Sequence, residues 1–122
     1  MKKYLSFFIL CFFLNSANVL AQAVPIAHLS VDLLSIQENG GVSKLTISLK
    51  DASGNSMNAP SNINVALTIS GSATLGSDYS ITNLTNIDDK IITISSGSSS
   101  AFLTFTSIND NDVETEEKIK AE

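Results

Sequence analysis

A cluster of five carboxylates lies between residues 108 and 117, directly after a run in which apolar and polar residues alternate. Two like charges about 4 Å apart repel by about 1 kcal/mol in water and about 4 kcal/mol near a protein surface, so such a loop favours a bound cation. Carboxylate oxygens suit Ca²⁺ above all, whereas the simpler alternative is a solvated acidic loop without a ligand. The five residues are Asp110, Asp112, Glu114, Glu116 and Glu117.

The first 21 residues have the pattern of a secretory signal peptide. Lys2 and Lys3 form a basic start, and the apolar run over residues 5–14 is too short to span a bilayer. Small residues ending at Ala21 provide a cleavage site. We therefore expect the protein to be secreted or located in the cell envelope or at the cell surface, with no membrane insertion after cleavage.

The rest of the chain is expected to form a short linker, residues 22–26, and one domain, residues 27–122. A lipoprotein site at Cys11 is a rival interpretation, but it would cut the apolar run in half. Without residues 1–21, about 100 residues remain, enough for a single core, and they contain no cysteine. All 12 acidic residues remain against fewer basic ones, which argues against nucleic acid and anionic membranes as partners.

Alternating apolar residues predict an all-β fold with antiparallel strands and no helix. Val42 is out of phase with its strand, which predicts a bulge or a later strand start. A connection of some twenty residues, rich in Gly, Ser, Thr and Asn, follows residue 69, and a loop of this length is usually functional or has another structural reason. The expected strands cover residues 28–36, 45–50, 63–69, 90–95 and 100–108, and a further strand begins near Lys118.

Antiparallel topology would gather most of the acids at one end of the domain. Successive connections alternate between the two ends of such a sheet, so the first, third and fifth connections share an end. Nine carboxylates at one end are costly without a cation, which strengthens the calcium hypothesis. Besides the five in the acidic cluster, they are Glu38, Asp78, Asp88 and Asp89, of which the last two border a predicted strand and so lie farther from this end.

Three motifs in this order resemble those of Calx-beta domains. They are Glu-Asn-Gly-Gly at residues 38–41, Ala-Thr-Leu-Gly-Ser-Asp-Tyr at 73–79, and Asp-Asn-Asp-Val-Glu-Thr-Glu-Glu at 110–117. The resemblance covers most of residues 27–122. It implies an immunoglobulin-like sandwich of seven strands that binds calcium at the end already singled out by topology.

The resemblance also implies a set of calcium ligands. Asn109 and Asn111 stand where the family often has further aspartates, which should weaken the site. The family continues through two further strands, so residues 27–122 are expected to be an incomplete domain with an unpaired sheet edge that invites strand addition. The implied metal ligands are Glu38, Asp78, Asp110, Asp112, Glu114 and Glu117.

Rival motifs are weaker. An EF-hand starting at Asp110 would have Thr115 in place of its glycine, and a cadherin-type linker would have Ser107 in place of an aspartate. His28 has no companion for a zinc site or a triad, so we expect a partly exposed strand histidine. Tyr79 is expected to pack beneath the long connection rather than bind a ligand, and the glycosylation triplet at Asn83 matters only in a eukaryote.

The function expected from the sequence is an exported, non-enzymatic calcium-binding module with a structural, adhesive or interdomain role. Its expected partners are calcium ions and neighbouring domains or another surface protein. The alternative is a structural or adhesive β-sandwich repeat whose calcium site is degenerate. A glycan-acting enzyme is disfavoured, because the chain has no Trp and only Tyr79 as a tyrosine beyond the signal peptide.

Overall fold

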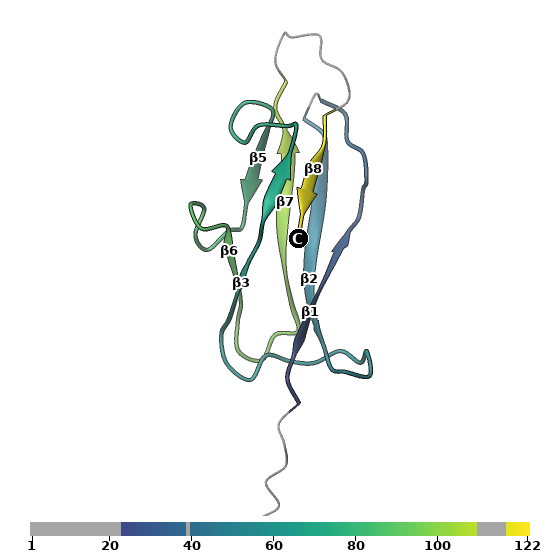
Figure 1. Cartoon of the computed structure of the whole chain (residues 1–122), viewed down its shortest axis with the longest axis vertical. Coiled ribbons are helices and arrows are strands. Elements are labelled where there is room, and N and C mark those ends of the chain that lie inside the picture. Colours follow the sequence, from purple (N-terminus) through teal and green to yellow (C-terminus); the bar gives the residue numbers. More distant parts are fainter. Residues whose placement is uncertain (1–22, 39, 110–116) are drawn as a thin grey trace, which may run out of the picture.

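The computed structural model describes residues 23–38, 40–109 and 117–122, which form eight β-strands and no helix (Figure 1). All strand pairs are antiparallel, so the predicted all-β antiparallel fold is confirmed. The expected signal peptide lies outside these residues. The strands are β1 (Ile26–Val31), β2 (Val42–Lys50), β3 (Ile63–Ala66), β4 (Ile69–Gly71), β5 (Tyr79–Thr82), β6 (Ile91–Ile94), β7 (Ser100–Ser107) and β8 (Ile119–Ala121).

The larger sheet has the strand order β1-β2-β7-β5. Strict alternation in β2 places Leu45, Ile47 and Leu49 on the buried face, where Leu45 lies opposite Leu103 of β7. The expected strand and its inward residues are thus confirmed. The predicted bulge or late start at Val42 is wrong: β2 begins at this residue, which is out of phase because its side chain lies on the exposed face of the sheet.

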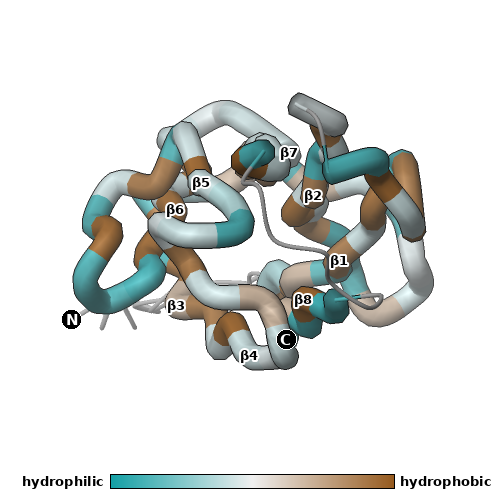
Figure 2. Tube along the Cα trace, turned by 90° about the horizontal axis from the view of Figure 1, so that it is seen from above, coloured by the Kyte–Doolittle hydropathy of each residue, from teal (hydrophilic) through white to brown (hydrophobic). Residues whose placement is uncertain are grey.

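The second layer consists of two pairs, β3-β6 and β4-β8. Viewed down the long axis, these pairs face the larger sheet across the apolar core (Figure 2). The sequence predicts one unbroken strand over residues 63–69, but the structure divides it between β3 and β4. The chain changes neighbours there: the N–H of Leu67 donates to the carbonyl of Lys90 at 3.0 Å, and that of Thr68 donates to the carbonyl of Glu122 at 2.8 Å.

Strand β5 lies inside the long connection that the sequence suggested was a loop. Tyr79 and Ile81 are buried and alternate with Ser80 and Thr82, and the strand pairs with β7 at the edge of the larger sheet. The polar residues of β5 are common in turns as well as in strands, so the sequence pattern did not predict this strand. The connection is therefore long because it contains a strand.

Strand β1 is exposed on both faces. The sequence predicts a half-buried strand over residues 28–36, yet the observed strand is Ile26–Val31 and all six residues are exposed. The register places Leu29 opposite Ile47 and Val31 opposite Leu45, on the core side of the sheet, but their exposed fractions are 39% and 42%. Within the described residues β1 pairs only with β2, and these exposed fractions show that its core-side face is incompletely covered.

The chain leaving β1 is held by the carboxylate of Asp32. Its Oδ1 accepts hydrogen bonds from the N–H of Lys44 at 2.6 Å, the N–H of Leu33 at 2.8 Å and the hydroxyl of Ser43 at 3.1 Å. The bond from the Lys44 N–H contributes most to a pKa of Asp32 below its ordinary 3.8. Hydrogen bonds to the ionised form favour that form.

We expect this clamp to weaken in acid. Because the folded-state pKa is lowered, the contribution of Asp32 is fully present above its ordinary value and is lost as the pH falls through the folded value. Urea unfolding measured from about pH 5 to about pH 2 should show a shallower decline for Asp32→Asn than for the unaltered protein. A decline of the same slope in both proteins would contradict the clamp.

Candidate metal centre at the loop end of the sandwich

Three connections meet at one end of the domain. The N–H of Ser107 donates to the carbonyl of Gly41 at 2.9 Å, and its hydroxyl donates to the carbonyl of Gln37 at 2.7 Å. The N–H of Ile108 donates to the carbonyl of Asp78 at 2.8 Å. These bonds join the β1–β2 connection, the loop before β5 and the segment that leaves β7, as the topological argument predicts for these three segments.

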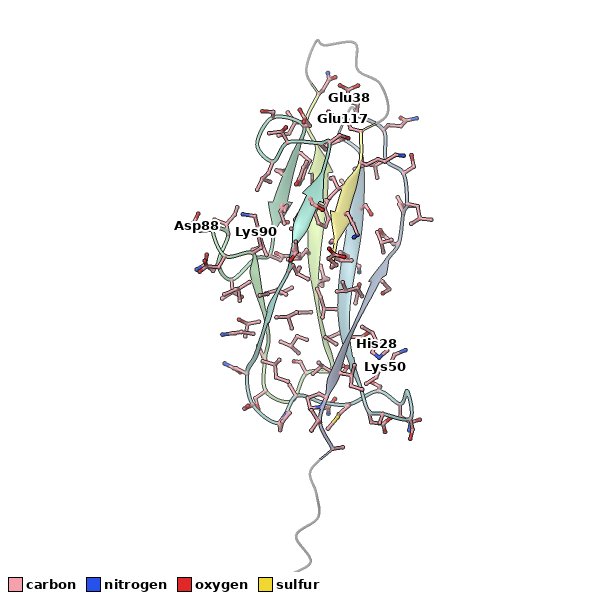
Figure 3. The ribbon with its side chains drawn as sticks, viewed as in Figure 1. His28, Glu38, Lys50, Asp88, Lys90 and Glu117 are labelled. Atoms are coloured by element: carbon pink, nitrogen blue, oxygen red, sulfur yellow. The ribbon has the colours of Figure 1, made fainter. Side chains whose placement is uncertain are left out.

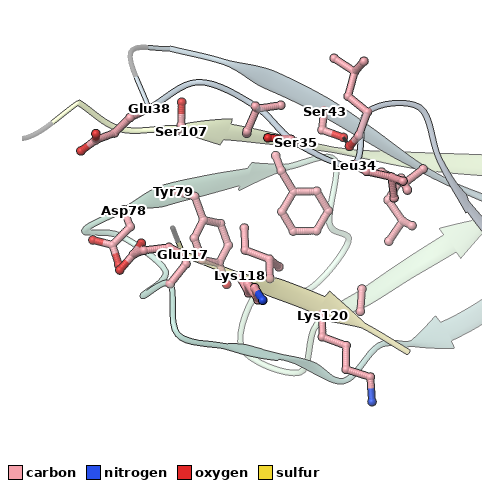
Figure 4. Close-up of a pocket in the computed structure, with 18 of the residues that line it drawn as sticks. Leu34, Ser35, Glu38, Ser43, Asp78, Tyr79, Ser107, Glu117, Lys118 and Lys120 are labelled. Atoms are coloured by element: carbon pink, nitrogen blue, oxygen red, sulfur yellow. Dashed lines mark hydrogen bonds between the residues drawn. The ribbon is translucent and has the colours of Figure 1, made fainter. Parts of the chain in front are cut away.

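Three of the six predicted ligands lie in the described residues, and all three lie at this loop end. Glu38 is exposed in the β1–β2 connection, Asp78 is half-buried just before β5, and Glu117 is exposed just before β8. Figures 3 and 4 show Glu38 and Glu117 at the end where the chain leaves β7, and Figure 4 shows Asp78 there as well. The other three, Asp110, Asp112 and Glu114, lie outside the described residues, as does Glu116.

Asp88 and Asp89 do not lie at the loop end, so their predicted place there is wrong. They occupy the turn between β5 and β6 at the side of the domain (Figure 3). Asn86 organises this turn: its side-chain oxygen accepts from the N–H of Asp88 at 2.9 Å, and its amide nitrogen donates to Asp89 at 2.9 Å. Strand β5 carries the chain away from the loop end before this turn begins.

Asp78 closes its own loop. Its carboxylate Oδ2 accepts a hydrogen bond from the N–H of Thr74, while its own N–H donates to the carbonyl of Thr74 at 2.9 Å. Gly76 takes the left-handed conformation that this tight loop requires, with φ of 93°. A carboxylate has about four acceptor positions, so one loop bond still allows it to bind a cation.

Tyr79 connects this loop to the core. Its side chain is buried, with 5% exposed, and its ring lies 6.0 Å from that of Phe105, so the predicted packing role is confirmed. Burial raises the pKa of Tyr79, and the neighbouring negative charge of Asp78 raises it further. The pKa of Tyr79 therefore depends on the charge of Asp78, which is one of the predicted ligands.

The donor chemistry at the loop end fits a hard cation, but the described part of the site is incomplete. Carboxylate oxygens from separate connections are the kind of ligands that Ca²⁺ binds. Among residues 23–38, 40–109 and 117–122, however, no three His, Cys, Asp or Glu side chains are close enough to hold a metal ion. A complete ligand set would need oxygens from residues 110–116.

A cavity of about 700 Å³ extends from this end between the larger sheet and β8. One wall is apolar and includes Val31, Leu45 and Phe105, and the opposite wall includes Ile119 and Ala121. Figure 4 shows predicted ligands at one end of this cavity. The cavity was not predicted from the sequence. The expected unpaired sheet edge is the feature from which it could have been inferred.

Comparisons with protein-family models, with curated proteins and with solved structures each found no match. The described residues include no helix long and apolar enough to cross a membrane. His28 is an exposed residue of β1, in agreement with the expectation of a strand histidine.

Proposed function

We propose that this protein is an exported, non-enzymatic calcium-binding module of Calx-beta type with a structural or adhesive role. The observation that carries the proposal is the meeting of three separate connections at one end, with a predicted ligand on each: Glu38, Asp78 and Glu117. Four further acidic residues, Asp110, Asp112, Glu114 and Glu116, lie between β7 and β8 in the sequence. A bound ion would tie these connections together and fix the geometry toward a neighbouring domain or partner.

Calcium should raise the melting temperature of the purified protein. A ligand at ten times its Kd adds about 1.4 kcal/mol to the free energy of unfolding, which corresponds to about 5–10 °C for a domain of this size. Calorimetry with Ca²⁺ or with chelator measures this shift. Asp110→Asn combined with Asp112→Asn should abolish it, because both changes remove charge from the proposed site.

The turn between β5 and β6 offers a matched control. Asp88→Asn combined with Asp89→Asn removes the same number of charges from the side of the domain, so the calcium shift should persist. If both double variants lost the calcium-induced rise in melting temperature equally, the rise would depend only on net charge. A folded protein that does not respond to calcium would refute the proposal.

Tyr79 should report binding at the loop end. Because the charge of Asp78 helps to raise the pKa of Tyr79, a cation bound to Asp78 should lower that pKa. Ultraviolet absorbance of the phenolate during alkaline titration, with and without Ca²⁺, measures the change. Asp78→Asn should lower the pKa without calcium and remove the calcium effect, whereas an unchanged titration with saturating calcium would exclude Asp78 as a ligand.

The second candidate is a structural or adhesive sandwich with a degenerate site. The bond between the Asp78 carboxylate and the N–H of Thr74 favours it, because this carboxylate already has a structural partner. Asn109 and Asn111 also lower the available charge. In that case folding and partner binding would be indifferent to chelator.

A further inference from the structure

The outer edge of β8 has no strand partner within the described part of the chain. Its one partner is β4, with Lys120 opposite Ser70, and the pairing continues to Glu122, which exchanges hydrogen bonds of 2.8 and 3.0 Å with Thr68. Backbone groups alternate in direction along an antiparallel strand. The N–H and C=O groups of Ile119 and Ala121 therefore point away from β4, toward the open side.

The inner face of β1 is the second uncovered surface. Leu29, Val31 and, beyond the strand, Leu33 expose 39%, 42% and 52% of their surface. The first two share a sheet face with the fully buried Ile47 and the nearly buried Leu45, so they lie on the core side without a covering layer. Apolar side chains in this position favour a partner that removes them from water.

The cavity of about 700 Å³ joins these two surfaces. Val31 and Leu33 line it from the β1 side, and Ile119 and Ala121 line it from the β8 side. An unpaired strand edge beside an apolar channel is the geometry of strand addition, in which main-chain bonds supply affinity and alternate side chains fill the channel. The occupant is therefore an extended peptide with an apolar residue at every second position.

The charged residues of β8 determine which side chains fit on the solvent face of the added strand. Lys118 and Lys120 also line the cavity, but they are exposed and alternate with Ile119 and Ala121, so their side chains extend toward the solvent side of the strand. The pair formed by Lys120 and Glu122, at 2.7 Å, is exposed and contributes little to stability. Opposite charges on neighbouring strands attract, so acidic residues on the solvent face of an added strand fit these lysines.

We propose that a strand of a separate polypeptide, in which apolar and acidic residues alternate, pairs antiparallel with the outer edge of β8 and closes the channel against β1. Its backbone bonds to Ile119 and Ala121, and its apolar side chains cover Leu29 and Val31. Its acidic side chains lie beside Lys118 and Lys120. The inference does not depend on calcium binding.

The first test uses the purified full chain without calcium and a blocked synthetic peptide, acetyl-Ser-Val-Glu-Val-Glu-Val-Ser-amide. Saturating peptide should slow amide hydrogen exchange of Ile119 and Ala121 by about tenfold or more, equivalent to about 1.4 kcal/mol. The reordered peptide Ser-Val-Val-Val-Glu-Glu-Ser has the same composition without alternation and should have no such effect. Equal effects of the two peptides would overturn the proposal.

Two valines provide a matched pair of variants. Val31→Glu places a charge on the inner face of the sheet and should weaken peptide binding about tenfold or more. Val42→Glu changes a similarly exposed valine on the outer face and should leave binding within about twofold. Thermal unfolding checks that both variants fold. Equal affinity of the two variants would refute the channel as the binding site.

Protection of Ile119 and Ala121 before any peptide is added would also overturn the proposal. If that protection increases with protein concentration, a second copy of the chain occupies the edge. If it is independent of concentration, the chain covers the edge by itself. Either result differs from failure of the calcium experiments, which concern the loop end.

Discussion

Replacing Leu103 with alanine should lower the free energy of unfolding by about 2–5 kcal/mol, because the substitution leaves a cavity at the centre of the core. Leu103 is fully buried on β7, which lies between β2 and β5. It faces Leu45 across the strand pair, so both the burial of its own side chain and the packing of its neighbour are lost. Urea unfolding monitored by circular dichroism measures the change.

Leu34→Ala is the control for this experiment. The same chemical change is made at a side chain that is 94% exposed, so the free energy of unfolding should change by no more than about 0.5 kcal/mol. Similar losses in both variants would mean that the core is not centred on β7. A loss at Leu103 below about 1 kcal/mol would mean that the site collapses around the smaller side chain.

Replacing Gly71 with alanine should separate β4 from β8 at a cost of about 3 kcal/mol. A Cβ at this position would lie 1.8 Å from the carbonyl oxygen of Lys118, and backbone is unable to move aside as a flexible side chain can. The φ of 141° adds strain for any residue with a side chain. Faster hydrogen exchange at the amides of Thr68 and Glu122 should reveal the loss of pairing.

Gly54→Ala distinguishes the steric effect from the cost of the backbone conformation. Gly54 also has a positive φ, of 86°, but no atom lies within 4 Å of its added Cβ. The variant should lose about 1 kcal/mol and retain slow exchange at Thr68 and Glu122. If Gly71→Ala keeps these amides protected, β8 is not held by its close approach to Gly71.

Strands in which alternation is strict could be predicted from the sequence. In β2, β6 and β7 the buried apolar residues occur at every second position, because one face of each strand packs on the core. The last predicted strand, near Lys118, is β8. In these segments the local pattern and the tertiary environment agree.

The predictions fail where the neighbours of a strand change along its length, or where no opposing layer covers its apolar face. The pattern over residues 63–69 continues without a break, yet the chain exchanges β6 for β8 as its neighbour between β3 and β4. In β1 the apolar residues alternate as in a buried strand, but alternation does not reveal whether an opposing layer exists. Both features depend on distant partners, which a local pattern does not contain.

The acidic residues at the loop end could be predicted only as far as the strands that precede them had been counted correctly. Glu38 and Asp78 follow the first and third predicted strands, so alternation of the two ends placed them together. Asp88 and Asp89 were misplaced because the unrecognised β5 reverses the direction of the chain before their turn. The identity of the metal ligands remains a prediction that rests on residues 110–116.

The central position of β7 also sets the order in which the protein can fold. The neighbours of β7 in the larger sheet, β2 and β5, both precede it in the sequence, and neither pairs with the other. During synthesis the β1–β2 hairpin can form early, but β2 lacks its second neighbour in the sheet until β7 has been made. Folding dominated by such distant pairings is slow. The newly made chain therefore passes through an intermediate with exposed apolar surface, and stable folding requires that the whole of β7 is available.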